Sequence, residues 1–295
     1  MSGRTDRLRI GRAAPYVFLA PFVLIFATFT LYPLAASVVL SFRQTVGTTV
    51  DRYVGWGNFA DLLRDPVFWG SMGRTAYFAA GSLLVQLPVA FGLALLVSQK
   101  RLWGRAFFRT VFFLPILIGG VFVGVSFIRI FGLQDGALNR YLGWVGIAAV
   151  DWLRDPKVVL DTLVLTGVWM FAGFNMVYFL AGLQAIPTEL YEAATIDGAN
   201  AWQRFRAITM PGIRPIAAFL VTASMIGSFG LFDLPWVLMT RGGPGRASTT
   251  VMIYLYERGF LAGDLGYAAA MGWLVVLFLL IASLVQLKVS RAWAE

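Results

Sequence analysis

Six long apolar stretches dominate the sequence, at residues 15–42, 75–98, 110–131, 159–184, 215–240 and 265–287. Each is longer than the ~20 residues that an α-helix needs to cross the hydrocarbon core of a bilayer. Only 13% of the residues are charged, against the ~25% that is usual in soluble domains. The sequence therefore predicts an all-α integral membrane protein with six transmembrane helices.

The distribution of Lys and Arg predicts the orientation in the membrane. Basic residues are denser in the segments 1–14, 99–109, 185–214 and 288–295 than in the remaining connections. Because cytoplasmic loops carry an excess of Lys and Arg, we expect these four segments and both termini to be cytoplasmic. The chain then consists of a cytoplasmic tail at 1–14, a transmembrane domain at 15–287 and a second tail at 288–295.

Several classes of function are excluded by residues that the sequence lacks. It has no cysteine and no histidine, so disulfides, zinc or haem ligation, and catalysis by these side chains are excluded. No lysine follows a glycine, so the phosphate-binding motif GxxxxGK[ST] is absent. The carboxylates do not cluster as in an enzyme, and the net charge of +9 is scattered at the ends of apolar stretches. We therefore expect no bound cofactor or metal, no catalytic residue and no nucleic-acid partner.

A polar segment of about 25 residues, 187–211, separates the fourth and fifth apolar stretches. Pro187 favours a break after the fourth span, because proline cannot donate to a preceding helical turn. A short helix is predicted over residues 189–196, closed at Gly198, since glycine suits the left-handed position after a helix. Asn200 with Gln203 three residues later is typical of a capping box, which starts a second helix.

The second short helix is predicted to end near Ile208, and Pro211 and Pro215 are predicted to bracket a turn into the fifth span. The whole segment 187–211, called the elbow below, would lie along the cytoplasmic surface of the membrane. Its residues alone leave two interpretations open. It is either an amphipathic connector between two spans or a docking site for another protein.

The elbow resembles the "EAA" coupling loop of ATP-binding-cassette (ABC) importer permeases. The resemblance rests on Glu192-Ala193-Ala194, Gly198, Ile208 and Pro211, with Met210 where the family usually has leucine. Other segments resemble the carbohydrate-uptake branch, the type found in maltose and glycerol-phosphate importers: residues 31–33, 54–59, 65–69, 113–115, 182–187 and 242–244. The resemblance implies the type I importer permease fold. It also implies coupling to an ATPase through the elbow residues Glu192, Ala193, Ala194, Asp197, Gly198, Ile208 and Pro211.

The resemblance further implies the partners of this chain. They are a second homologous permease subunit, two ATPase subunits that bind ATP and Mg, and an extracytoplasmic solute-binding protein. The solute would be a sugar or a sugar-phosphate-like compound, and the chain would lie among lipids of a bacterial inner membrane. The alternative function is an ion-coupled secondary carrier that works without an ATPase, with Asp233 as the coupling carboxylate.

Candidate solute-contacting residues lie in the fourth and fifth stretches. Charged residues inside a span usually face protein or water, which draws attention to Asp233. If the fifth helix continues past Pro235, Phe229 and Asp233 share one of its faces. Asn175 and Tyr178 in the fourth stretch, and Ser228 in the fifth, are the other candidates, and the family's pathway uses these two spans. The alternative roles are packing for the aromatic rings, helix–helix hydrogen bonding for Asn175 and pairing with a partner subunit for Asp233.

Two features of the third stretch predict structure rather than function. Gly120 and Gly124 are spaced as a pair of small residues that marks close helix packing in membranes. Arg129 lies near the end of the stretch, where a long side chain reaches the membrane surface.

Overall fold

A computed structural model describes residues 14–47, 50–99, 102–239 and 242–292. The chain divides into two compact units, Met1–Leu62 with Arg258–Trp273 and Leu63–Glu257 with Leu274–Glu295. Five helices in the described part are long and apolar enough to span a membrane: Tyr16–Ser41, Pro66–Ser98, Val159–Gln184, Ala201–Phe229 and Leu265–Ser290. A bent pair, Arg105–Ile118 with Gly120–Ile130, makes a sixth if it is one span.

The first unit contains the helix that begins the described chain. This helix is built from α1 (Ala14–Phe26), the π-turn η1 (Ala27–Leu31) and α2 (Tyr32–Ser41). Two strands follow, β1 (Arg43–Val46) and β2 (Val50–Tyr53). Three elements cross the division between the units: α3 (Gly57–Arg64), the π-turn η5 (Glu257–Leu261) and α15 (Leu265–Ala292).

The two short strands add a β-hairpin to a fold that is otherwise helical, as predicted. They pair antiparallel, with Arg43 opposite Tyr53 and Val46 opposite Val50. Arg43 donates from Nε to Asp51 Oδ1 at 2.7 Å, which adds an ion pair across the hairpin. The first strand begins two residues after the membrane helix ends, and its backbone groups pair with those of the second strand.

All the secondary-structure elements described in the second unit are helical. In chain order it contains α4 (Pro66–Gly81), the π-turn η2 (Ser82–Gln86), α5 (Leu87–Ser98), α6 (Arg105–Ile118), α7 (Gly120–Ile130), α8 (Ala137–Trp144), α9 (Val159–Gln184), α10 (Thr188–Ile196), α11 (Ala201–Arg204), the π-turn η3 (Phe205–Thr209), α12 (Met210–Phe229), α13 (Asp233–Leu238), the 3₁₀ turn η4 (Pro244–Arg246) and α14 (Val251–Tyr256). Helix α9 is its central element, because it contacts α4, α5, α6, α7 and α12.

Two apolar cores hold this unit together. One gathers Phe78, Val123, Leu163 and Leu234 with their neighbours, around α7, α13 and the start of α9. The other gathers residues such as Met176 and Leu220 around α5, the end of α9 and α12. Two hydrogen bonds also join α12 to α15, from Thr222 Oγ1 to Gln286 Oε1 (2.6 Å) and from Gln286 Nε2 to the Ala218 carbonyl (3.1 Å).

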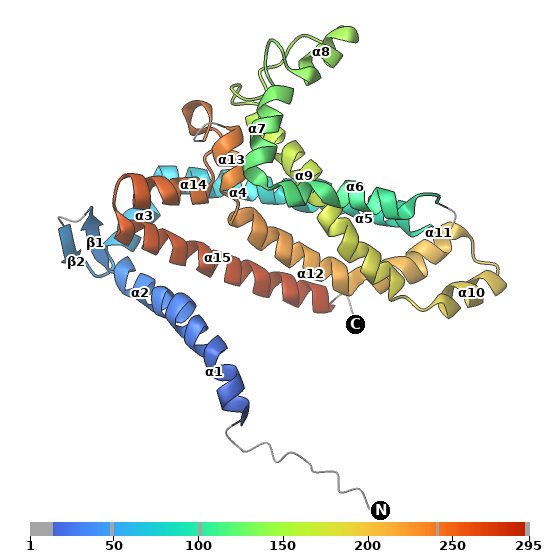
Figure 1. The fold of residues 1–295 in the computed structure, drawn as a ribbon, viewed down its shortest axis with the longest axis horizontal. Coiled ribbons are helices and arrows are strands. Elements are labelled where there is room, and N and C mark those ends of the chain that lie inside the picture. The colour runs from blue at the N-terminus through green and yellow to red at the C-terminus, as the bar shows by residue number, and fades with distance from the viewer. Residues whose placement is uncertain (1–13, 48–49, 100–101, 240–241, 293–295) are drawn as a thin grey trace, which may run out of the picture. The chain divides into compact units, whose positions relative to one another are not determined.

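The second and third spans differ from the sequence expectations. The second begins at Pro66 rather than near residue 75, because the Asp65 side chain caps the helix by accepting from the Val67 amide. The third is not one straight helix. It bends by 100° at Gly119, whose φ of +84° is a backbone conformation that glycine adopts readily. Helix α7 therefore turns away from α6 (Figure 1).

The fifth span, expected at 215–240, occupies different residues. One continuous helix runs from Ala201 to Phe229, and Pro211 and Pro215 lie inside it rather than around a turn. Pro211 has no backbone N–H to donate to the preceding turn. The π-turn η3 accommodates it, because the Met210 amide donates to the Phe205 carbonyl five residues back. The helix then ends at Phe229 and a separate short helix, α13, follows.

Candidate functional site

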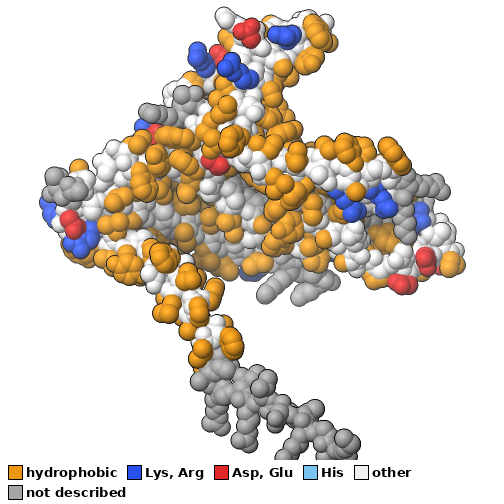
Figure 2. Space-filling model, viewed as in Figure 1, with side chains coloured by type: hydrophobic (Ala, Val, Ile, Leu, Met, Phe, Trp, Pro, Cys, Tyr) orange, Lys and Arg blue, Asp and Glu red, His pale blue; other side chains and the backbone are white. Residues whose placement is uncertain are grey.

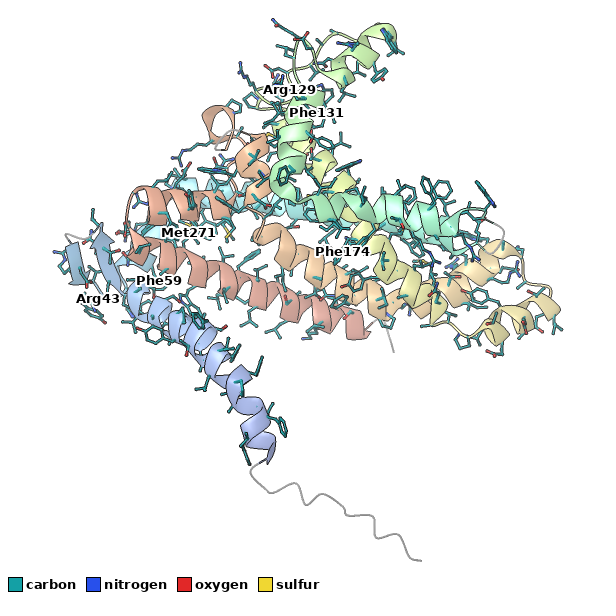
Figure 3. All side chains as sticks on the ribbon, in the orientation of Figure 1. Arg43, Phe59, Arg129, Phe131, Phe174 and Met271 are labelled. Carbon is teal, nitrogen blue, oxygen red and sulfur yellow. The ribbon has the colours of Figure 1, made fainter. Side chains whose placement is uncertain are left out.

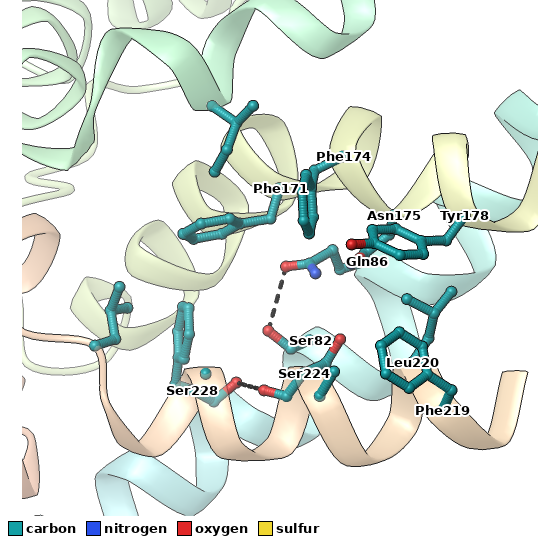
Figure 4. A pocket seen from close by; sticks show the side chains of 15 residues that line it. Ser82, Gln86, Phe171, Phe174, Asn175, Tyr178, Phe219, Leu220, Ser224 and Ser228 are labelled. Atoms are coloured by element: carbon teal, nitrogen blue, oxygen red, sulfur yellow. Dashed lines mark hydrogen bonds between the residues drawn. The ribbon is translucent and has the colours of Figure 1, made fainter. Parts of the chain in front are cut away.

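A cavity of about 340 Å³ lies inside the second unit, enclosed by the segment α4–η2 and by α6, α9 and α12 (Figure 4). Its lining includes Phe78 from one apolar core and Leu220 from the other, so the cavity lies where the two cores meet. Ile116 of α6 also contributes. The cavity is therefore built within this chain alone, from four membrane-spanning segments.

The polar lining of the cavity consists only of neutral groups, namely Ser82, Gln86, Asn175, Tyr178, Ser224 and Ser228. Asn175 is 5% exposed and Gln86 is 3% exposed. Gln86 Oε1 accepts from Ser82 Oγ at 3.3 Å, and Ser228 Oγ donates to the Ser224 carbonyl at 2.7 Å. Within the described chain, the side-chain amide of Asn175 makes no hydrogen bond, so it is available to a molecule in the cavity.

Aromatic rings form much of the remaining wall, from Phe78, Phe171, Phe174, Tyr178 and Phe219. Phe174 and Tyr178 pack edge to face with ring centroids 5.1 Å apart, and Tyr178 lies 5.7 Å from Phe219. Rings that pack against one another hold their faces in fixed positions. A cavity with aromatic walls and a few neutral hydrogen-bonding groups suits an uncharged ring that carries hydroxyl groups.

The cavity brings together three of the residues predicted for solute contact, Asn175, Tyr178 and Ser228. Phe229 does not line it, because its ring is buried against Phe278 of α15 at 5.3 Å. Asp233 does not line it either, because α12 ends at Phe229 and the expected shared helical face does not exist. A role in solute contact stays a prediction for all five residues.

Asp233 lies at the first turn of α13, against the first residue of α7. A Cβ atom placed on Gly120 would come within 2.3 Å of Asp233 Oδ2, and one on Gly124 within 3.0 Å of a Val237 methyl carbon. The prediction that this glycine pair marks close helix packing is confirmed. A carboxylate beside a helix N-terminus is electrostatically favoured, which explains Asp233 without a solute. Arg129 is exposed at the far end of α7 (Figure 3), and its reach to the membrane surface stays a prediction.

Sequence reasoning missed the contribution of the second span, Ser82 and Gln86. A signal was present, because Gln86 is the one amide side chain inside the apolar stretch 75–98, and Ser82 lies four residues before it. Both belong to the π-turn η2, and such turns occur frequently at functional sites.

The elbow consists of α10, a turn, and the start of the long helix that continues into α12. Helix α10 runs over Thr188–Ile196 and Gly198 follows at φ +76°, as predicted. The predicted capping box is also present, since Asn200 and Gln203 exchange hydrogen bonds between side chain and backbone. The predicted end of the second helix near Ile208 is wrong, because the helix continues.

Two hydrogen bonds attach α10 to that long helix. The hydroxyl groups of Tyr191 and Thr209 lie 2.9 Å apart, and Arg204 donates to Thr195 Oγ1 at 2.7 Å. None of the side chains of α10 is buried in the described chain. Glu192, Ala193, Asp197 and Gly198 are exposed, whereas Ala194, Ile208 and Pro211 are half-buried. The elbow therefore presents an open surface while staying fixed to α12.

Comparison with known proteins decides the family. Residues 86–294 match the family described as "Binding-protein-dependent transport system inner membrane component". The chain belongs to this family. It is therefore a transport permease of the inner membrane, in a family whose ATPase is a separate subunit.

Individual relatives cover nearly the whole permease. The arabinooligosaccharides transport system permease protein AraP of Bacillus subtilis is 36% identical over 99% of this chain and 93% of that protein. The lactose transport system permease protein LacF of Rhizobium radiobacter is 32% identical over 94% and 93%. A solved bacterial ABC transporter that imports the acidic polysaccharide alginate contains a similar chain, with a TM-score of 0.82 and 25% identity over 95% of this chain and 96% of that one.

Proposed function

We propose that this chain is the sugar-permease subunit of an ABC importer and that its cavity holds the sugar during passage. The observation that carries the proposal is the buried, unpaired amide of Asn175 in an aromatic-walled cavity of a membrane bundle. Sugars present apolar C–H faces to aromatic rings and hydroxyl groups to amides. Relatives named for arabinooligosaccharides and lactose support the same class of solute.

The charge of the cavity favours a neutral sugar over a sugar phosphate. None of the lining residues is Asp, Glu, Lys or Arg. An anionic solute would lose its hydration there without meeting an opposite charge, which is strongly unfavourable. Ser82, Gln86 and Asn175 offer neutral donors and acceptors instead. Of the two solute types that the sequence leaves open, the neutral one fits this lining.

Replacement of Asn175 tests the cavity. We expect Asn175→Leu to raise the apparent KM for sugar uptake about fivefold to tenfold, because hydrogen bonds to the sugar worth roughly 1 kcal/mol each are lost. Uptake of radiolabelled arabinooligosaccharide, lactose and glycerol 3-phosphate by vesicles containing the assembled importer would measure this. Val177→Ala is the matched control, because Val177 lies on the same helix but does not line the cavity. An unchanged KM for Asn175→Leu would show that the cavity is not on the sugar's path.

We also propose that the elbow docks an ATPase subunit on the cytoplasmic side, with both termini on that side. The complete importer would contain a second homologous permease and two ATPase subunits below the membrane, and a binding protein on the opposite face. Exposed apolar side chains on α10 and α11, such as Leu190, Ile196 and Trp202, support a protein partner. Since the elbow is fixed to the helix that also carries Ser224 and Ser228, movement at the ATPase would reach the cavity wall.

A bulky residue on α10 tests the docking. Ala193 is exposed in the middle of that helix, so Ala193→Trp should leave the chain folded but hinder the approach of another protein. We expect the ATPase subunit to be lost from the complex purified in mild detergent, and uptake to fall to background. Ala137→Trp, on the exposed first residue of α8, is the control. Normal recovery of the ATPase with Ala193→Trp would contradict the assignment.

A further inference from the structure

The membrane helix α15 carries a single carboxamide side chain, Gln286. Its neighbours Leu284, Val285 and Leu287 are apolar and exposed. Gln286 itself is half-buried. Hydrophobic side chains also predominate on the face of the molecule shown in Figure 2. An amide in such surroundings is costly unless it is hydrogen-bonded, and Gln286 finds its partners on α12.

Both ends of the Gln286 amide attach to α12. Its Oε1 accepts from Thr222 Oγ1 at 2.6 Å, and its Nε2 donates to the Ala218 carbonyl at 3.1 Å. Because these two groups are one turn apart and hydrogen bonds are directional, the planar amide fits one rotational setting of α12. Near the end of α12, Phe229 also packs against Phe278 of α15 with ring centroids 5.3 Å apart. That contact is apolar and therefore much less directional.

The opposite face of α12 lines the solute cavity. Leu220 and Ser224 each lie two residues from Thr222, hence about 160° away around an α-helix. Both line the cavity, and so does Ala223. A rotation of α12 by about 20° would move a side-chain atom about 5 Å from the helix axis by roughly 2 Å. Contacts with a bound molecule do not survive a displacement of that size.

We propose that Gln286 is a positioning residue for the cavity. It touches no solute, but it fixes the rotation of α12 and thereby the direction in which Ala223 and Ser224 face. The consequence for sugar transport rests on the proposed function of the cavity, whereas the consequence for α12 does not. Because the elbow continues into α12 as one helix, a movement that starts at the elbow would either turn α12 against this amide or carry α15 with it.

Cysteine labelling tests the rotation, because the chain itself has no cysteine. Ala223 and Ser224 are about 100° apart, so rotation of α12 moves one toward the cavity and the other away from it. A small water-soluble thiol reagent is applied to Ala223→Cys and to Ser224→Cys, each in the full-length chain in nanodiscs. We expect Gln286→Met to change the ratio of the two labelling rates about threefold to tenfold, the factor that one or two hydrogen bonds between membrane helices contribute.

Matched variants separate the hydrogen bonds from the shape of the side chains. Thr222→Ser keeps the hydroxyl group and should leave the ratio unchanged. Thr222→Val keeps the shape, should act like Gln286→Met, and provides the same test if Gln286→Met does not fold. Ser37→Ala removes a different hydrogen bond of α15, from Trp273 Nε1 to Ser37 Oγ at 3.2 Å, and should have no effect on the ratio.

An unchanged ratio in Gln286→Met and Thr222→Val would overturn the proposal. An equal rise of both labelling rates would also overturn it, because that is expected when the bundle loosens and Gln286 only stabilises it. Uptake of radiolabelled lactose by the assembled importer is measured in parallel, and we expect it to be impaired in the same variants. A changed ratio with normal uptake would support the role of Gln286 and count against the cavity as the sugar's path.

Discussion

Three glycines on α9 let neighbouring helices approach its backbone. A Cβ atom on Gly173 would lie 1.7 Å from the Phe112 carbonyl oxygen of α6, and one on Gly182 would lie 2.9 Å from an Ile216 side-chain carbon of α12. Gly167 is equally close to the Phe78 ring. In membranes, where apolar burial does not favour helix association, close contact of this kind stabilises the bundle. These contacts hold α9 against α4, α6 and α12, the helices that line the cavity with it.

Gly173→Ala should destabilise the bundle. The added methyl group meets a backbone oxygen, which cannot move without shifting α6, so we expect a loss of about 1–3 kcal/mol. Thermal unfolding of the purified chain in detergent would show this as a lower Tm. Gly92→Ala in α5 is the matched control, because nothing lies within 4 Å of its added Cβ and alanine favours helix. Equal Tm values for the two variants would refute the packing argument.

At the scale of elements, π-turns allow membrane helices to continue through prolines. In each of three cases the residue before the proline donates to the carbonyl five residues back: Tyr32 to Ala27, Leu87 to Ser82, and Met210 to Phe205. The wider turn accommodates the proline ring, which would otherwise clash with the preceding turn. This arrangement also sets the register of the residues on either side. In η2, it brings both Ser82 and Gln86 to the cavity.

Deletion of Leu84 should therefore abolish sugar uptake. Removing one residue from η2 changes the register of α4 relative to α5 by about 100° of helical rotation, since an α-helix has 3.6 residues per turn. Ser82 and Phe78 would then leave the cavity. Leu84→Ala is the control, because it removes the same exposed side chain and keeps the register. Comparison of uptake and of membrane insertion for the two variants tests this, and uptake by the deletion variant would contradict it.

Sequence reasoning located the membrane helices better than their interruptions. Length and apolarity were sufficient for α9 and α15, whose bounds agree with the predicted stretches within a few residues. They could not reveal the bend at Gly119, which lies in an apolar run without any polar residue. They also could not show that the fifth helix ends at Phe229, so the helical phase assigned to Asp233 was wrong. Asn175, Tyr178 and Ser228 depended on no such continuation, and they share the cavity.

At the scale of the whole molecule, this chain would form part of the solute's path, and a separate ATPase subunit would supply the energy for transport. The chain has no GxxxxGK[ST] motif, and its family uses a separate ATPase. The alternative function, an ion-coupled carrier, would need a carboxylate in contact with the solute cavity. Asp233, the candidate for that role, is outside the cavity and lies against Gly120.

Transport should therefore depend on ATP and on the partner subunits. In vesicles that contain the assembled importer and its binding protein, we expect sugar uptake only with enclosed ATP and Mg. Vesicles with this chain alone should show background uptake under a proton or sodium gradient. Both are measured with the same radiolabelled sugar. Uptake by the chain alone without ATP would favour the secondary carrier instead.

The bend at Gly119 has a consequence for how tightly the membrane is sealed. Helix α6 has 14 residues and so is about 21 Å long, shorter than the ~30 Å hydrocarbon core. Two helix ends meet at the bend, and their free backbone groups require water or protein contacts. If water supplies those contacts, the barrier to ions at this level must be formed by the rest of the bundle. That part includes the ring of Phe91, which packs against Phe179 and Phe205.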